Sequence, residues 1–157
     1  MDSGREHREE LITAAVQASR YAYAPYSNFP VGAAAYTVSG ELITGANVEN
    51  ASYGLTLCAE TSLVAELIKH TDTDGTKRPP TLASIAVVNP HGEVLLPCGR
   101  CRQVLSEFAS EKTLLLTPTG FLPLAQLLPM AFGPKDLDVK TASTPESAGA
   151  ATVREGQ

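Results

Sequence analysis

Apolar residues recur along the chain at two spacings, and each spacing predicts one kind of element. Repeats of three and four residues, which place apolar side chains on one face of a helix, occur in several segments. The predicted helices are residues 5–22, 58–70 and 98–109, followed by a shorter helical turn in 122–132 that Pro129 closes. The apolar stripes of the first two are Leu11, Ile12, Ala15 and Val16, and Leu63, Val64, Leu67 and Ile68.

Short apolar runs bounded by turn-forming residues predict strands. Residues 31–50 indicate two strands around a Ser39-Gly40 turn, and residues 23–30 and 71–80 are polar or proline-containing loops. Further strands are predicted in residues 81–90, 91–97 and 112–118. Because strands alternate with helices after an opening hairpin, we predict an α/β three-layer sandwich, a mixed β-sheet with helices on both faces.

The 157 residues fit a single domain, which we place at residues 1–139. Residues 140–157 lack an apolar pattern, and we expect a disordered tail there. No apolar run approaches a membrane span, and the charged beginning "MDSGREHREE" has no apolar core of a secretory signal, so we expect a cytoplasmic protein. A net charge of −5 disfavours nucleic acid as a partner.

The only three cysteines of the chain all stand at predicted helix starts. Cys98 and Cys101 are three residues apart behind Pro97 and face the same way, and Cys58 opens another helix. Free N–H groups at a helix start favour thiolate over thiol. Two converging helix starts would form a three-thiolate metal site with one position left for water, as in catalytic zinc sites.

Simpler interpretations of these residues stay open at this stage. A free cysteine often only fills space in a core. A closed structural zinc site would need a histidine as fourth ligand, and none has ligand-like spacing. Glu60, two residues after Cys58, is either a partner of the helix dipole or a base that takes the proton of metal-bound water.

The segments "NVENASYGLTLCAE" and "PCGRCRQ" resemble the homotetrameric zinc-dependent cytidine deaminase family, over about residues 24–137. The resemblance implies hydrolysis of cytidine and 2′-deoxycytidine to uridine and 2′-deoxyuridine with release of ammonia, in pyrimidine salvage. It implies one zinc ion per chain, bound by Cys58, Cys98 and Cys101. A zinc-bound hydroxide would attack the base, and Glu60 would shuttle the proton.

The same resemblance implies the substrate contacts and a homotetramer. Asn47 and Glu49 would bind the sugar, Ala59 would offer backbone atoms to the base, and Phe29 would pack against it. Tyr53 and Phe132 would reach a neighbouring subunit's site. Without the resemblance, solvated strand ends are the favoured interpretation of the two polar residues. Phe29 is then equally well a core residue, and the other two aromatic residues are core or interface.

Thr61 departs from the family pattern, because many members with three cysteines carry arginine there. Three thiolates leave zinc with a formal charge of −1, which a donor to the sulfurs would offset. Arg102 is the favoured donor, and Arg100, the Thr61 hydroxyl and the helix dipoles are the alternatives. Two alternatives remain for the chain as a whole: a deaminase of another cytosine-bearing nucleoside, and a non-catalytic zinc-stabilised binding module.

Overall fold

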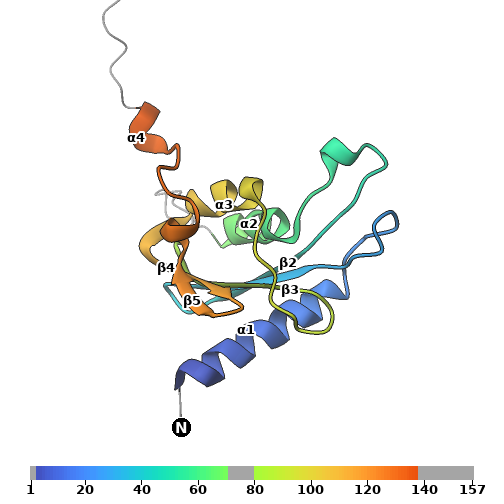
Figure 1. Cartoon of the computed structure of the whole chain (residues 1–157), viewed down its shortest axis with the longest axis horizontal. Coiled ribbons are helices and arrows are strands. Elements are labelled where there is room, and N and C mark those ends of the chain that lie inside the picture. The colour runs from blue at the N-terminus through green and yellow to red at the C-terminus, as the bar shows by residue number, and fades with distance from the viewer. Residues whose placement is uncertain (1–2, 71–79, 138–157) are drawn as a thin grey trace, which may run out of the picture.

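The computed structural model describes residues 3–70 and 80–137, and a five-stranded mixed sheet forms its middle layer (Figure 1). The strands are β1 (Gly32–Thr37), β2 (Leu42–Ala46), β3 (Leu82–Val88), β4 (Ala109–Thr117) and β5 (Gly120–Pro123). Their order across the sheet is β2-β1-β3-β4-β5. Strands β3 and β4 are parallel and every other pair is antiparallel, so the predicted mixed sheet is confirmed.

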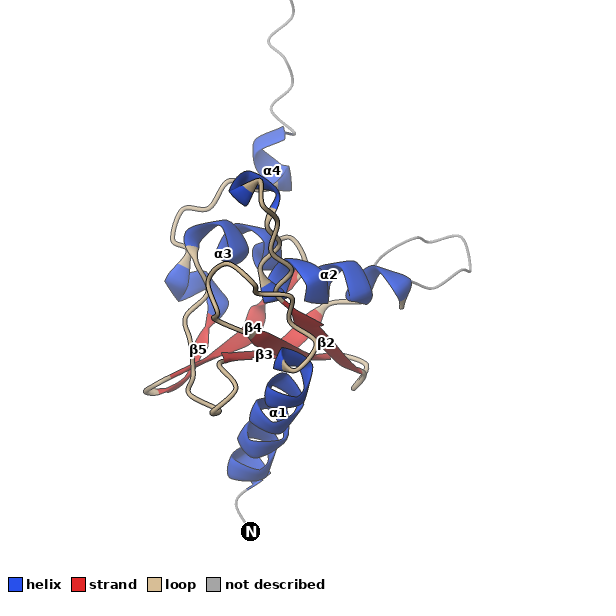
Figure 2. Cartoon of the chain, turned by 90° about the vertical axis from the view of Figure 1, so that its right-hand side faces the viewer, coloured by secondary structure: helices blue, strands red, loops and turns tan. Residues whose placement is uncertain are grey.

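Helices cover both faces of this sheet, as predicted. Helix α1 (Ser3–Ser19) lies on one face, and α2 (Ala59–Lys69) and α3 (Gly99–Ser106) lie together on the other (Figure 2). The remaining helical segments are short: η1 (Tyr53–Leu55), η2 (Leu124–Leu127) and α4 (Pro134–Leu137). None of the described helices combines the length and the apolar character that crossing a bilayer demands.

Each face of the sheet has its own apolar cluster. On the α1 face, Leu11 and Ala15 pack against Ala34, Ala86 and Val88. The opposite cluster joins alternate residues of the same strands to the buried side of α2 and to α3; among its members are Ala33, Ala35, Leu63, Leu67, Ile85, Val87 and Leu105. Central strands buried on both faces therefore show the continuous apolar runs seen in the sequence.

Two glycines let the helices approach the sheet closely. A Cβ atom on Gly32 would lie 1.8 Å from the carbonyl oxygen of Ala15 in α1. A Cβ atom on Gly45 would lie 2.3 Å from the amide nitrogen of Leu63 and 2.5 Å from the carbonyl oxygen of Ala59. The absence of a side chain at Gly45 thus sets how deeply the first turns of α2 settle on β2.

Some predicted elements need correction. The strand expected in residues 91–97 is wrong: the segment pairs with β3 through a bridge between Val88 and Val94 and a bond from the Leu95 N–H to the Val87 carbonyl (2.8 Å), after a turn in which the Asn89 N–H donates to the Glu93 carbonyl (3.1 Å). The segment follows the turn at residues 89–92 directly and pairs with the end of β3 alone, so its single bridge does not extend into a strand. Ile68 was expected on the buried stripe of α2, but 45% of its surface is exposed.

Other expectations have mixed outcomes. The Ser39-Gly40 hairpin turn is confirmed, with Gly40 at a φ of 89° that suits glycine. The helical turn before Pro129 is confirmed as η2, whereas β5 and α4 were not anticipated. The loop expected in residues 71–80 falls, except for its last residue, outside the described residues, and so does the tail expected in residues 140–157.

Candidate active site

The three cysteines meet where two helices begin. Cys58 is the N-cap of α2, Cys98 is the N-cap of α3, and Cys101 lies in the first turn of α3. Their sulfur atoms all lie within 4.8 Å of one another. The predicted convergence of two helix starts is therefore confirmed.

This cluster suits a zinc ion in number and in chemistry. A tetrahedral zinc ion with Zn–S bonds of about 2.3 Å separates its sulfurs by about 3.8 Å, a spacing that the three thiols approach. Soft sulfur donors favour zinc over hard cations such as Mg²⁺. Within the described residues, no histidine, aspartate or glutamate joins the cluster. The alternative of a fourth, histidine ligand therefore finds no support there.

The thiols differ in their electrostatic environment. Burial raises the pKa of Cys101, which is fully buried, and also that of the half-buried Cys58; the nearby Glu60 carboxylate adds to both shifts. Partial burial alone would raise the pKa of Cys98, but hydrogen bonds from backbone and thiol groups, those of Cys101 foremost, lower it. A bound cation would offset the cost of ionising Cys58 and Cys101, the two thiols whose pKa is raised.

A cleft of about 270 Å³ opens beside the thiols. Cys58, Glu60 and Cys98 line it, and Glu60 is only 4% exposed. Phe29, Asn47 and Ala59 line the same cleft, so the structure brings together most of the predicted site residues. The other walls are largely apolar and include Val31, Leu57, Val87, Leu95 and Leu96. A small apolar cleft with a few polar groups is typical of a site for a flat organic molecule.

A second hollow, of about 380 Å³, contains Glu49 and Tyr53. Ser27 and Thr56 line both hollows, so the two are contiguous. A larger hollow of about 540 Å³ between α1 and the sheet is lined by Glu6, Glu9 and Glu10 and includes none of the predicted residues. Chemistry, and not volume, therefore identifies the candidate site.

Asn47 and Glu49 both face the loop of residues 23–31. The Asn47 side-chain oxygen accepts a hydrogen bond from the Val31 N–H (2.8 Å), and its amide nitrogen donates to the Phe29 carbonyl (3.1 Å). The Glu49 carboxylate accepts from the backbone N–H groups of Tyr26 (2.9 Å) and Ser27 (3.2 Å) and from the Ser27 hydroxyl. These bonds, that of the hydroxyl foremost, hold the pKa of Glu49 below its usual value.

The two aromatic residues expected at a subunit boundary are exposed in the single chain. Tyr53 is 74% exposed and meets Tyr26 edge to face, with ring centroids 6.0 Å apart. Phe132 is 61% exposed and does not line the cleft of its own chain, although its carbonyl accepts a bond from the Gln103 side chain (2.8 Å). The single chain thus brings Tyr53, but not Phe132, to the joined hollows.

Arg102 does not have the sulfur contacts that we expected. Its guanidinium donates to the carbonyls of Pro97 (2.9 Å) and Leu127 (3.1 Å), which ties the residue before Cys98 to η2. Arg100 donates to the Thr56 carbonyl (3.4 Å). The Thr61 hydroxyl is buried and has no hydrogen-bond partner among the described residues.

Comparison with known proteins agrees with this geometry. A family model described as the cytidine and deoxycytidylate deaminase zinc-binding region matches residues 5–117. A cytidine deaminase of Mycobacterium tuberculosis is 50% identical over 123 residues, which cover 78% of this chain and 87% of the relative. A cytidine deaminase of Halalkalibacterium halodurans is 40% identical over 136 residues, which cover 83% and 98%.

Solved structures give the same result. The crystal structure of cytidine deaminase from M. tuberculosis superimposes with a TM-score of 0.71 at 47% identity, covering 80% of this chain and 96% of that one. That of cytidine deaminase from Mycobacterium leprae has a TM-score of 0.70 at 47% identity and covers 77% and 96%. The segment matched by the family model includes all three thiols and Glu60.

Proposed function

The chain belongs to the cytidine deaminase family, and on this premise we propose that the cleft beside its three thiols is where cytidine and water become uridine and ammonia. The enzyme is a zinc-dependent hydrolase with one zinc ion per chain. One observation supports this placement of the reaction: three sulfurs cluster together, and two of them line one small apolar cleft with a buried carboxylate.

We assign the metal to Cys58, Cys98 and Cys101. A zinc ion held by these three thiolates would lower the pKa of a bound water molecule, so that hydroxide would be available as the nucleophile near neutral pH. The helix starts at Cys58 and Cys98 support this set, because their dipoles favour the negative charge of the thiolates. Arg102 holds Pro97 in place and so helps to aim Cys98.

Glu60 is the residue that we expect to move the proton. It lines the cleft next to Cys58, in the first turn of α2, and its side chain is almost completely shielded from solvent. A general base in this position takes a proton from water and delivers it to the ring nitrogen N3. The remaining proton of that water, now on the C4 hydroxyl, would then pass to the amino group, so that the C4–N bond breaks, ammonia leaves and the C4 carbonyl of uridine forms.

The two joined hollows suggest how a nucleoside lies. The cytosine ring fits the apolar cleft, with Phe29 against it and the Ala59 backbone at its edge. The sugar then extends towards Asn47 and Glu49, whose oxygen atoms can accept from its hydroxyls.

We further propose a homotetramer in the cytoplasm. Exposed apolar residues support the assembly: Tyr53 and Leu55 in η1, and Met130 and Phe132 in the segment after η2. Phe132 would complete the site of a neighbouring subunit, because it lies outside the cleft of its own chain. A reducing compartment suits three thiols that must remain free to bind metal.

Loss of cytidine absorbance tests the proposal directly. Wild-type protein should release one ammonia per cytidine consumed, and 1,10-phenanthroline should abolish the activity until zinc is restored. Glu60→Gln should keep its zinc but lose at least about two orders of magnitude in kcat. Glu66→Gln is the matched control, because Glu66 lies on the same helix and, among the described residues, its ion pairs are with Lys69 and His70 at the end of that helix. A Glu60→Gln variant as active as the control would refute the assigned role.

A further inference from the structure

We propose that Ser27 is a positioning residue for substrate binding. Its hydroxyl connects the Glu49 carboxylate, which contacts the sugar, to the backbone of Phe29, which packs on the base. The role rests on the proposed function, because it takes Glu49 and Phe29 as the substrate contacts. Nothing in the pattern of the sequence singled out Ser27, which lies in the exposed loop before β1.

The Ser27 side chain makes two hydrogen bonds of opposite sense. Its hydroxyl donates to Oε1 of Glu49 and accepts from the backbone N–H of Phe29 (3.0 Å). A hydroxyl has one donor and two acceptor directions, so both bonds form at once. The Ser27 backbone N–H adds a bond to Oε2 of Glu49 (3.2 Å), and the carboxylate is therefore held through both oxygens.

The position of Ser27 matches this role. It lines both the cleft beside the thiols and the hollow that contains Glu49, so it stands where base and sugar would meet. Phe29 is held from two sides, with its N–H bound to Ser27 and its carbonyl bound to Asn47. Both residues assigned to the sugar are thus linked to the residue assigned to the base.

The backbone between the two residues also depends on this link. Asn28 has a φ of 53°, in the left-handed region that only glycine and a few residues such as asparagine adopt readily. Its N–H is bound to the Ala24 carbonyl (3.0 Å), and the Ser27–Phe29 bond closes the turn across it. Without the hydroxyl, Phe29 loses one of its two tethers, and Glu49 loses the contribution that lowers its pKa most among its hydrogen bonds.

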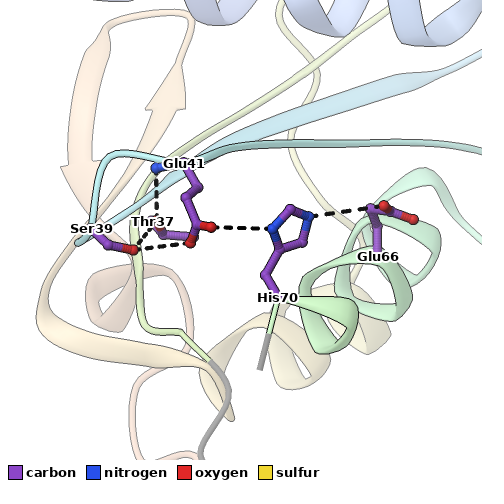
Figure 3. Close-up of polar contacts among 5 residues, drawn as sticks. All are labelled: Thr37, Ser39, Glu41, Glu66 and His70. Carbon is purple, nitrogen blue, oxygen red and sulfur yellow. Dashed lines mark hydrogen bonds and ion pairs between the residues drawn. The ribbon is translucent and has the colours of Figure 1, made fainter. Parts of the chain in front are cut away.

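The test compares Ser27→Ala and Ser27→Thr with a control at a similar turn. In the hairpin turn after β1, the Ser39 hydroxyl donates to the Glu41 carboxylate (3.0 Å), which also contacts His70 (Figure 3), and neither Ser39 nor Glu41 lines the two hollows. Ser39→Ala therefore removes the same kind of bond from an equally exposed serine without touching the cleft.

We expect Ser27→Ala to raise KM for cytidine about tenfold, the scale of one charge-assisted hydrogen bond, with kcat within about twofold of wild type. Ser27→Thr should return KM to within about threefold, and Ser39→Ala should leave it unchanged. An NMR titration should show the pKa of Glu49 rising in Ser27→Ala only, a change that a general loss of stability would not produce.

Several results would overturn the role. A Ser27→Ala enzyme with wild-type KM and an unchanged Glu49 pKa would do so, and so would a Ser27→Thr enzyme as impaired as Ser27→Ala. A wild-type protein that releases no ammonia from cytidine would refute the proposed function and this role together. An active wild type beside an unaffected Ser27→Ala would refute the role of Ser27 alone.

Discussion

Replacing Gly45 with alanine should disturb the active site indirectly, by pushing α2 away from β2. Gly45 lies in β2, under the first turns of α2, and its missing side chain lets that helix sit close to the strand. The atoms that a new Cβ would meet belong to the backbone of Leu63 and Ala59, so a side-chain rotation cannot relieve the contact.

The size of the effect follows from these distances. Ordinary contacts begin at 3.4 Å, whereas the Cβ would lie at 2.3 Å and 2.5 Å, so α2 must move by about 1 Å. Overpacking of this kind costs about 3 kcal/mol when rigid atoms collide. For a domain of this length, that lowers Tm by roughly 6–12 °C. Because α2 carries Glu60 and begins at Cys58, a shift of about 1 Å should also cost about 100-fold in kcat/KM.

Calorimetry and the cytidine assay, both on zinc-loaded protein, measure the two effects. Gly54→Ala is the matched control for stability, because its Cβ would meet nothing within 4 Å, and its Tm should stay within about 2 °C of wild type. A Gly45→Ala protein with wild-type Tm and activity would show that α2 can yield at no cost, and the account of how the sheet positions the thiols would be wrong.

Further predictions concern the charged and exposed residues around the cleft. Because the folded-state pKa of Glu49 is lowered, its carboxylate should stay charged as the pH falls through the usual value of about 4.3. The sugar contact should weaken only below that pH, so the KM for cytidine should rise there in wild type but not in Glu49→Gln. Arg102→Gln should lower zinc affinity about 10- to 100-fold in a chelator competition, and unchanged affinity would show that its bonds to Pro97 and Leu127 do not aim Cys98. Light scattering should give four times the 16.5 kDa of one chain, and a fully active monomer would exclude the tetramer. Phe132→Ala should lower activity while leaving the secondary structure of each chain intact, as seen by circular dichroism.

The layered fold could be predicted from the sequence because its central elements carry strong local patterns. The stripe of α1 and the apolar run of β3 identify a helix and a strand buried on both faces. Strand β5 was not predicted because it is four residues long and only half-buried, so it has neither a long apolar run nor a clear alternation of apolar and polar residues. The strand expected in residues 91–97 did not form because its apolar run, residues 94–96, is short and pairs with β3 only through one bridge at Val88.

The thiols and Glu60 could be found for a similar reason, since residue type and helix-start position together point to metal chemistry. The partners of Arg102 could not be found, because the Leu127 carbonyl is 25 residues away in the chain and the charge argument pointed to sulfur. The role of Ser27 could not be predicted from the sequence, because serine is a common residue in polar loops. Its proposed role depends on two contacts that only the folded turn creates.

The placement of the ligands makes the metal centre a cross-link as well as a reaction centre. Cys58 and Cys98 lie 40 residues apart in the chain, and an ion shared between them ties the start of one helix to the start of the next across the whole of β3. By the relation for closing a loop of that length, such a tie removes about 4 kcal/mol of chain entropy from the unfolded state. This is a large share of the total stability of an ordinary domain. Oxidation of the thiols or removal of the ion would therefore lower the stability of the folded protein as well as its catalytic activity. In cells short of zinc, the amount of folded enzyme should then fall together with its activity.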